Sequence, residues 1–173
     1  MDRASPDPAA IGIRPLLPSD SLEELTDLLH RAYAELGAMG FNYTAVDQDA
    51  AATARRIEGN HCLVAVEGGR LVGTVTLSPR WPKPLPPWRE GLRTAFLNQL
   101  AVDPGRRGIG LGARLMEAAE GRARELGFPS VSLDTAEGAV HLVRLYEGRG
   151  YRAVGFHSWP GKTYRSVVLE KRF

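Results

Sequence analysis

The stretch VDPGRRGIGLGARL, residues 102–115, contains four glycines and three arginines and leads into an apolar helical pattern. Glycines leave backbone N–H groups unshielded, and the macrodipole of a helix adds partial positive charge to the N–H groups at its start. The arginines are a further source of positive charge. The stretch therefore predicts an anion-binding turn between a strand and a helix, of the kind that binds phosphate groups.

The chain has 173 residues, of which 43% are hydrophobic, and this is enough for one domain with a core of its own. Residues 1–10 are rich in proline, alanine and aspartate, so they are expected to form a flexible tail. Residues 11–173 are expected to form a single domain.

Composition excludes several classes of function. The only cysteine, Cys62, cannot form a disulfide or a cysteine metal site within one chain, and no metal is expected. The net charge of +2 comes from interspersed charges, which argues against a nucleic-acid partner. No apolar run approaches the roughly 20 residues of a membrane span, and the N-terminus lacks the apolar segment of a secretory signal. We expect a soluble cytoplasmic protein, monomeric or homodimeric, with no membrane partner.

The first half of the chain reads as a strand at 11–17, two helices and a hairpin. A helix is expected to begin at Asp20, with Glu23 completing a capping box, and to stop at Gly37. Residues 38–46 are expected to form a loop, and residues 47–59 a second helix. Residues 62–77 contain two β-branched runs around Gly68 and Gly69, a pattern typical of a hairpin.

The second half begins with SPRWPKPLPPWREG, residues 78–91, whose five prolines exclude a regular element. Strands are expected at 94–102, 130–135, 151–159 and 163–171, with helices at 109–126 and 139–150. This order predicts a mixed α/β fold in which about seven strands, mostly antiparallel, form a central sheet flanked by about four helices.

A dinucleotide site is one alternative for the glycine turn. Gly108, Gly110 and Ala113 satisfy the G-x-G-x-x-G/A pattern, and Asp134 follows at about the distance of a ribose-binding acid. However, residues 103–107 separate Val102 from Gly108, whereas the first glycine of that fold comes straight off the strand. A Walker P-loop is excluded because no Lys-Ser/Thr pair follows the glycines.

The turn resembles the acetyl-CoA site of the GNAT acyltransferases, whose pattern Q/RxxGxG/A is matched by Arg107, Gly110 and Gly112. The element order is also that of the family. The resemblance implies that backbone N–H groups cradle the CoA pyrophosphate, that arginines including Arg114 supply charge, and that the preceding strand holds the pantetheine arm. The acetyl-CoA contacts it implies are Leu100, Ala101, Val102, Arg106, Arg107, Gly108, Ile109, Gly110, Leu111, Gly112 and Ala113.

A second match is AVHLVRLYEGRGYRAVG, residues 139–155, which resembles the family helix AxxLYxxxGF. It implies that Tyr146 lies near the thioester sulfur and acts as the catalytic acid. Two departures are evident. An asparagine found in many relatives is replaced here by Ala139, and a strand glutamate aligns with Phe96. The catalytic base is therefore unassigned, and His141 and His157 are the titratable candidates near the expected cleft.

The acceptor pocket is expected beneath the loops around residues 38–46 and 78–91 and near the C-terminus. Phe41, Tyr43 and Trp81 are expected to line it, together with Trp88 and Trp159, while Asn98 can orient a water molecule. The predicted function is acetyl-CoA-dependent N-acetylation of a primary amine, by direct transfer in a ternary complex. The alternatives are a CoA-binding sensor without catalysis and an NAD-type dinucleotide-binding protein.

Overall fold

The computed structural model describes residues 10–82 and 84–173, so nearly all of the expected tail at 1–10 lies outside the described residues. In this part of the chain seven strands form one sheet in the order β1-β2-β3-β4-β5-β7-β6, and every neighbouring pair is antiparallel except β4 and β5. The strands are β1 (Gly12–Pro15), β2 (His61–Glu67), β3 (Arg70–Ser78), β4 (Ala95–Val102), β5 (Ser130–Ala136), β6 (Arg152–His157) and β7 (Ser166–Arg172). The predicted mixed, mostly antiparallel α/β fold is confirmed.

The described residues contain five α-helices, one more than the sequence predicts. They are α1 (Leu22–Ala38), α2 (Thr44–Asp47), α3 (Ala50–Ile57), α4 (Leu111–Glu125) and α5 (Val140–Gly148). The additional helix, α2, is a single turn inside the stretch expected to be a loop. Between Ser78, which ends β3, and Gly91, the described residues contain no regular element beyond a short 3-10 turn at Pro87–Arg89, as the prolines predict.

The start and end of α1 differ from the prediction. The N-cap is Ser21, whose hydroxyl accepts a hydrogen bond from the backbone N–H of Glu24 over 3.1 Å. Asp20 does not cap the helix because its carboxylate forms a 2.6 Å ion pair with Arg14. At the other end the helix continues through Gly37, where an added Cβ would lie 2.9 Å from Val46 Cγ1. That glycine gives α2 room to approach α1 instead of ending the helix.

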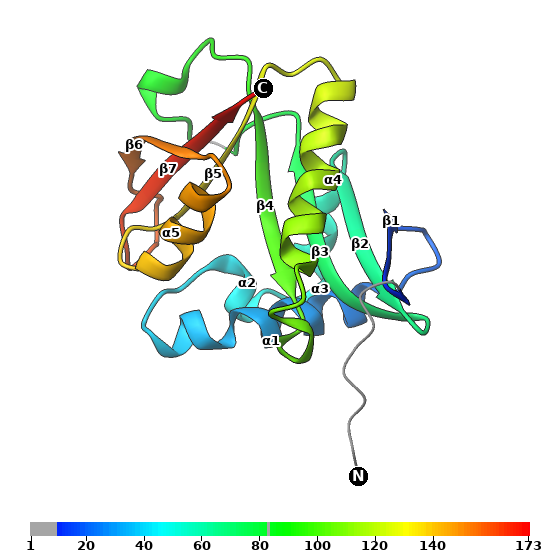
Figure 1. Ribbon diagram of the computed structural model, residues 1–173. Helices are drawn as coiled ribbons and strands as arrows, with labels where there is room; N and C mark the ends of the chain where they lie inside the picture. The colour runs from blue at the N-terminus through cyan, green and yellow to red at the C-terminus, as the bar shows by residue number, and fades with distance from the viewer. Residues whose placement is uncertain (1–9, 83) are drawn as a thin grey trace.

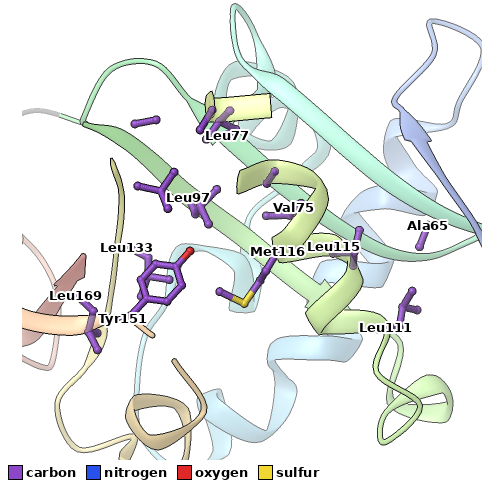
Figure 2. Packing of buried hydrophobic residues seen from close by; sticks show 14 of the residues in the cluster. Ala65, Val75, Leu77, Leu97, Leu111, Leu115, Met116, Leu133, Tyr151 and Leu169 are labelled. Atoms are coloured by element: carbon purple, nitrogen blue, oxygen red, sulfur yellow. The ribbon is translucent and has the colours of Figure 1, made fainter. Parts of the chain in front are cut away.

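The sheet is covered on both faces. Alternate residues of a strand point to opposite sides, and β2 shows the consequence: Ala65 packs in a cluster with Leu115 of α4, whereas Val64 packs with Leu25 and Leu28 of α1. Figure 2 shows Leu115 in the first cluster, between the helix and the sheet. Fully burying a leucine stabilises the fold by about 1.5–3 kcal/mol. These two layers hold the sheet in place from both sides.

The central strands separate along their length. β4 and β5 pair only at Ala95 with Val131 and at Phe96 with Ser132, and beyond these residues the two strands diverge (Figure 1). The rest of β4 keeps its pairing with β3 alone. The edge of β4 that faces β5 therefore has backbone groups without strand partners from Leu97 onward.

A β-bulge interrupts β4 where it leaves β5. The pairing passes from Thr76 with Asn98 to Thr74 with Ala101, so an additional residue of β4 is accommodated there. Gln99 takes the left-handed conformation, with φ of 53°, which is uncommon for a residue other than glycine. The bulge changes the alternation of side chains, so that Asn98 and Gln99 both turn toward the face covered by α1 to α3.

Candidate functional site

A cleft with a volume of about 1130 Å³ opens where β4 parts from β5. One set of its lining residues comes from the start of α4 and from α5, and another comes from α1 to α3 and the segment between β6 and β7. The cleft therefore reaches both faces of the sheet. It brings together most of the residues that the sequence analysis assigns to acetyl-CoA: Leu100, Ala101, Val102, Arg106, Arg107, Gly108, Gly110, Leu111, Gly112 and Ala113. Ile109 does not line the cleft and packs against the main core instead.

The glycine turn lies at one end of this cleft. A short 3-10 turn at Pro104–Arg106 follows β4, and Gly110 then forms the N-cap of α4 with φ of 79°. The first N–H groups of a helix have no partner within it. A Cβ added at Gly108 or Gly110 would meet no atom within 4 Å, and one at Gly112 would meet only Val102 Cγ2 at 3.6 Å. The backbone of this turn is therefore open to a ligand.

Arginines surround the turn, and carboxylates hold several of them. Arg106 donates through Nε to Glu67 over 2.8 Å, and Arg107 donates to the carbonyl of Ala32 over 2.8 Å and to Glu35 over 3.2 Å. The pair formed by Arg107 and Glu35 is largely exposed and contributes little stability. The bond to the Ala32 carbonyl therefore does more than the ion pair to hold this guanidinium, which lines the cleft beside the glycine turn.

Arg149 is a cleft residue that the sequence analysis missed. It follows α5, lines the cleft, and donates to the carbonyl of Ala113 over 3.3 Å and to Glu117 over 3.2 Å. It therefore adds positive charge beside the first turn of α4. No sequence motif marks this arginine, because its position depends on how α5 packs against α4.

Tyr146, the predicted catalytic acid, lies on α5 and lines the cleft together with Leu100 to Val102 of β4. Burial raises the pKa of its phenol, so the group stays protonated. Its ring packs edge-on with the ring of Tyr151, and the two ring centroids lie 6.2 Å apart. No other described residue forms a hydrogen bond with its hydroxyl. The phenol is a stable hydrogen-bond donor, and the raised pKa makes it a weaker acid than an ordinary tyrosine.

Asp134 is the titratable carboxylate at the opposite end of the cleft. It lies on β5 and accepts a hydrogen bond from the indole Nε1 of Trp159 over 2.9 Å. Burial raises its pKa above the usual range, although the hydrogen bonds from Ser166 and Trp159 oppose this effect. A carboxylate with a raised pKa is a stronger base than an ordinary one. From the sequence alone, Asp134 is a candidate only for a ribose ligand.

The two histidines differ in their access to the cleft. His141 lines it and is exposed to solvent. His157 does not line the cleft. Its ring packs edge-on with the ring of Trp159, and the two ring centroids lie 4.4 Å apart. His157 therefore supports the indole that bonds Asp134, and it does not face the cleft itself.

The predicted acceptor residues divide into two sets. Tyr43, Asn98 and Trp159 line the cleft, whereas Phe41, Trp81 and Trp88 do not. Phe41 lies against Gly138, where an added Cβ would be 3.0 Å from its ring. The ring centroids of Trp81 and Phe96 lie 4.5 Å apart. The rings of Phe41 and Trp81 both pack loops onto the sheet, where each has an apolar neighbour. Neither contact can be predicted from the spacing of residues in the sequence.

Two further cations that line the cleft were not predicted from the sequence. Arg56 on α3 and Lys162 between β6 and β7 line the cleft on the side of Asp134. Tyr33 and Tyr164 lie there as well, and Trp159 joins them with the indole that bonds Asp134. This end of the cleft combines charged groups with aromatic rings.

Other kinds of site find less support in the described part of the chain. It contains no group of three or more side chains suited to a metal ion. No helix in residues 10–82 and 84–173 combines the length and apolar character needed to cross a membrane. The sheet is mostly antiparallel, and a 3-10 turn separates β4 from Gly108, so the arrangement required for an NAD-type site is not present.

Comparisons with known proteins agree with this geometry. The Acetyltransferase (GNAT) family matches residues 22–151. The S-(2-succino)cysteine N-acetyltransferase of Bacillus subtilis (strain 168) is 31% identical over 152 residues, which cover 87% of this chain and 89% of the relative.

Solved structures share the fold. A GNAT family acetyltransferase from Elizabethkingia anophelis with acetyl-CoA bound has a TM-score of 0.68 at 15% identity, covering 95% of this chain and 99% of that one. An acetyltransferase from Streptococcus agalactiae has a TM-score of 0.69 at 21% identity over the same shares of the two chains. With the family match extending over most of the sequence, the chain belongs to the GNAT family of acetyltransferases.

Proposed function

We propose that the protein transfers an acetyl group from acetyl-CoA to a primary amine, directly and within a ternary complex. The observation that carries this proposal is the cleft that opens between β4 and β5, which is lined both by the open backbone of the glycine turn and by Asp134, a carboxyl group whose pKa is raised by burial. Two substrates can enter such a cleft from opposite faces of the sheet and meet beside β4.

The turn end suits CoA. Free N–H groups at the start of α4 and the nearby arginines fit a pyrophosphate, which needs several donors and little steric bulk. The free edge of β4 beyond Phe96 offers backbone groups to the amide-containing pantetheine arm, as an added strand would use them. The Elizabethkingia structure, which shares this fold, has acetyl-CoA bound.

The other end suits an amine. An alkylammonium group with a pKa near 10.4 must lose a proton before its nitrogen can attack. Asp134 is the base that we assign to this step, acting directly or through a water molecule, because burial raises its pKa and the cleft exposes it to the acceptor. The name of the Bacillus relative also specifies N-acetylation.

The leaving group departs near Tyr146. The amine nitrogen forms a bond to the thioester carbon, the bond from that carbon to sulfur breaks, and the thiolate takes up, directly or through water, the proton that the nitrogen loses on becoming an amide, which gives CoA. Because burial raises the pKa of Tyr146, its phenol serves best by donating a hydrogen bond to the developing thiolate, and full proton transfer from it is less favourable than from an ordinary tyrosine. This role is narrower than the acid role suggested by the resemblance.

Direct transfer is favoured over a covalent acyl-enzyme. Cys62 is buried on β2, does not line the cleft, and lies 3.5 Å from the hydroxyl of Thr74. Burial raises the pKa of its thiol and so reduces the thiolate fraction that could act as a nucleophile.

Calorimetry with acetyl-CoA and with NAD, followed by an assay of free thiol released from acetyl-CoA with a panel of amines, tests this proposal. The panel includes S-(2-succino)cysteine, the compound in the name of the Bacillus relative. Binding of acetyl-CoA together with turnover of at least one amine is expected. Binding without turnover of any amine would favour the CoA-binding sensor, and no binding of any CoA thioester would refute both.

A further inference from the structure

We propose that the acceptor amine carries a carboxylate, which Arg56 and Lys162 bind, so that the substrate is an amino acid or an amino-acid derivative. This inference rests on the proposed function and specifies its acceptor. It starts from the two cations at the Asp134 end of the cleft.

Arg56 is held in place by buried amides. Its Nη1 donates to Gln48 Oε1 over 2.7 Å, and Gln48 Nε2 in turn donates to Gln99 Oε1 over 3.0 Å. Gln48 is only 5% exposed and Gln99 only 4%. Gln99 is the left-handed residue of the bulge in β4. Through Gln48, the bulge therefore positions the guanidinium of Arg56 at the acceptor end of the cleft.

Lys162 is also anchored without a carboxylate. Its Nζ donates to the carbonyl of Asn42 over 2.8 Å and to Thr44 Oγ1 over 2.9 Å. An ammonium group has three N–H donors, so one is left for a ligand. These contacts fix the lysine over the loop between α1 and α2, on the same side of the sheet as Arg56.

These two cations differ from the other basic residues of the cleft. Arg106, Arg107 and Arg149 each form an ion pair with a glutamate. Within residues 10–82 and 84–173, no carboxylate lies within 4 Å of the charged nitrogens of Arg56 or Lys162. Buried or partly buried charges in proteins are normally paired. A carboxylate on the ligand would supply the missing partner.

The electrostatics of the cluster agree with an anionic ligand group. Burial, and then the positive charge of Arg56, lower the pKa of Lys162. Both cations line the same cleft, so the effect of Arg56 is the repulsion between like charges. The carboxyl groups of Asp47 and Asp134 act in the opposite direction, but among the described residues neither forms an ion pair with Lys162. A bound carboxylate would compensate both positive charges.

The arrangement suits a molecule with both an amine and a carboxylate. Asp134 and the two cations line the same end of the cleft, so an amine directed to Asp134 can have its carboxylate near Arg56 and Lys162. An amine without a carboxylate would leave two desolvated cations without a counter-ion. The end of the cleft thereby discriminates against simple amines and amides. Tyr33 and Tyr164 line the same region and can contact the side chain of the amino acid.

Matched acceptors test the inference. The probes are L-amino acids of each side-chain class, S-carboxymethyl-L-cysteine and S-benzyl-L-cysteine, each compared with its α-carboxamide. Turnover is measured by thiol release, and binding is measured by calorimetry on the CoA-loaded protein. At least one acid should be preferred over its amide, by roughly 10- to 100-fold in kcat/KM or affinity, as expected for charge-assisted hydrogen bonds.

The Arg56→Gln and Lys162→Gln variants should remove most of that preference by raising KM for the acid, and should leave the amide nearly unchanged. Arg55→Gln is the matched control, because Arg55 is exposed on the same helix and does not line the cleft. A merely structural effect would weaken acid and amide together, and that result would overturn the inference.

Failure of the inference differs from failure of the proposed function. Equal turnover or binding of acid and amide throughout the panel would refute the carboxylate site and leave N-acetylation in place. Preferential binding of an acid without turnover of any amine would support the site and refute the catalytic proposal.

Discussion

Trp159 donates a hydrogen bond from its indole Nε1 to Oδ2 of Asp134 over 2.9 Å, joining the segment after β6 to β5 at the acceptor end of the cleft. The bond orients a carboxylate that burial makes more basic, while it also stabilises the charged form. A catalytic base needs both a fixed direction and a suitable pKa. This contact therefore supplies the direction, and burial supplies the basicity.

Asp134 should control the pH dependence of the reaction. Because its pKa is raised, the deprotonated base form appears only at a higher pH than for an ordinary aspartate, and kcat/KM should rise with pH through that pKa. Asp134→Asn should remove this rise and lower kcat by roughly 10²- to 10⁴-fold. Asp27→Asn, an exposed site on α1, is the control. A pH profile of Asp134→Asn identical to that of the original protein would exclude the assignment.

The same group should affect stability in the opposite direction. A carboxyl with a raised folded-state pKa is ionised more readily in the unfolded chain, so its contribution favours the folded state at low pH and is lost as pH rises toward the folded pKa. Asp134→Asn should therefore unfold at a higher temperature than the original protein at neutral pH, and this gain should shrink in acid. Thermal unfolding at several pH values measures the difference.

Tyr146→Phe should bind acetyl-CoA with unchanged affinity and turn over more slowly. Burial keeps the phenol protonated across the usual pH range, so no limb of the pH profile should disappear in this variant. Loss of one hydrogen bond to a developing charge typically lowers kcat by roughly 10²- to 10³-fold. Calorimetry and steady-state kinetics measure the two effects. Unchanged kcat would remove Tyr146 from the mechanism.

Three glycine-to-alanine substitutions test whether glycine is required for acetyl-CoA binding or for the stability of the fold. Gly112→Ala should leave the free energy of unfolding nearly unchanged, since the new Cβ would make only an ordinary contact, yet it should weaken acetyl-CoA binding. Gly110→Ala should additionally destabilise by about 1–2 kcal/mol because φ is positive there.

Gly121→Ala, on the same helix, is the matched control. An added Cβ there meets no atom within 4 Å, so the variant should gain up to about 1 kcal/mol from helix propensity without a change in binding. Urea unfolding and calorimetry distinguish the three variants. If Gly112→Ala bound acetyl-CoA as tightly as Gly121→Ala, the turn would not be the pyrophosphate site.

Arg89 should be a stability residue. It is 4% exposed and donates to Glu170 over 2.8 Å and to Ser132 Oγ over 2.6 Å. Arg89→Met would leave the buried Glu170 with only the exposed Arg172 as an ionic partner and should cost about 3–5 kcal/mol of unfolding free energy. Arg80→Met, at an exposed site in the same segment, should cost little.

The pair also gives a pH test. Burial alone would raise the pKa of Glu170, but the hydrogen bond and charge of Arg89, together with hydrogen bonds from Arg172 and Ser132, outweigh burial and hold the pKa below its usual value. The stability that the pair contributes should therefore be lost as pH falls through that low pKa, and Arg89→Met should show a weaker loss in acid. Equal acid sensitivity in both proteins would contradict this account.

The sequence by itself determined the features that depend on local chemistry. Glycine pairs and β-branched runs specified the hairpin of β2 and β3, and Gly68 and Gly69 take the positive φ values such a turn requires. Periodicity specified α4 and α5, and the glycine turn was placed correctly before α4. The predicted N-cap, Asp20, was wrong by one residue. Asp20 forms an ion pair with Arg14, which belongs to β1, so Ser21 caps the helix instead.

Only the tertiary structure decided which side chains meet in the cleft. Asp134, Arg56 and Lys162 come from β5, α3 and the segment between β6 and β7, and no spacing in the sequence relates them. Their meeting depends on the divergence of β4 from β5 and on the bulge at Gln99. The turn for CoA is contiguous in the chain and therefore readable from it, whereas the acceptor end is assembled by strand pairing and packing over long separations.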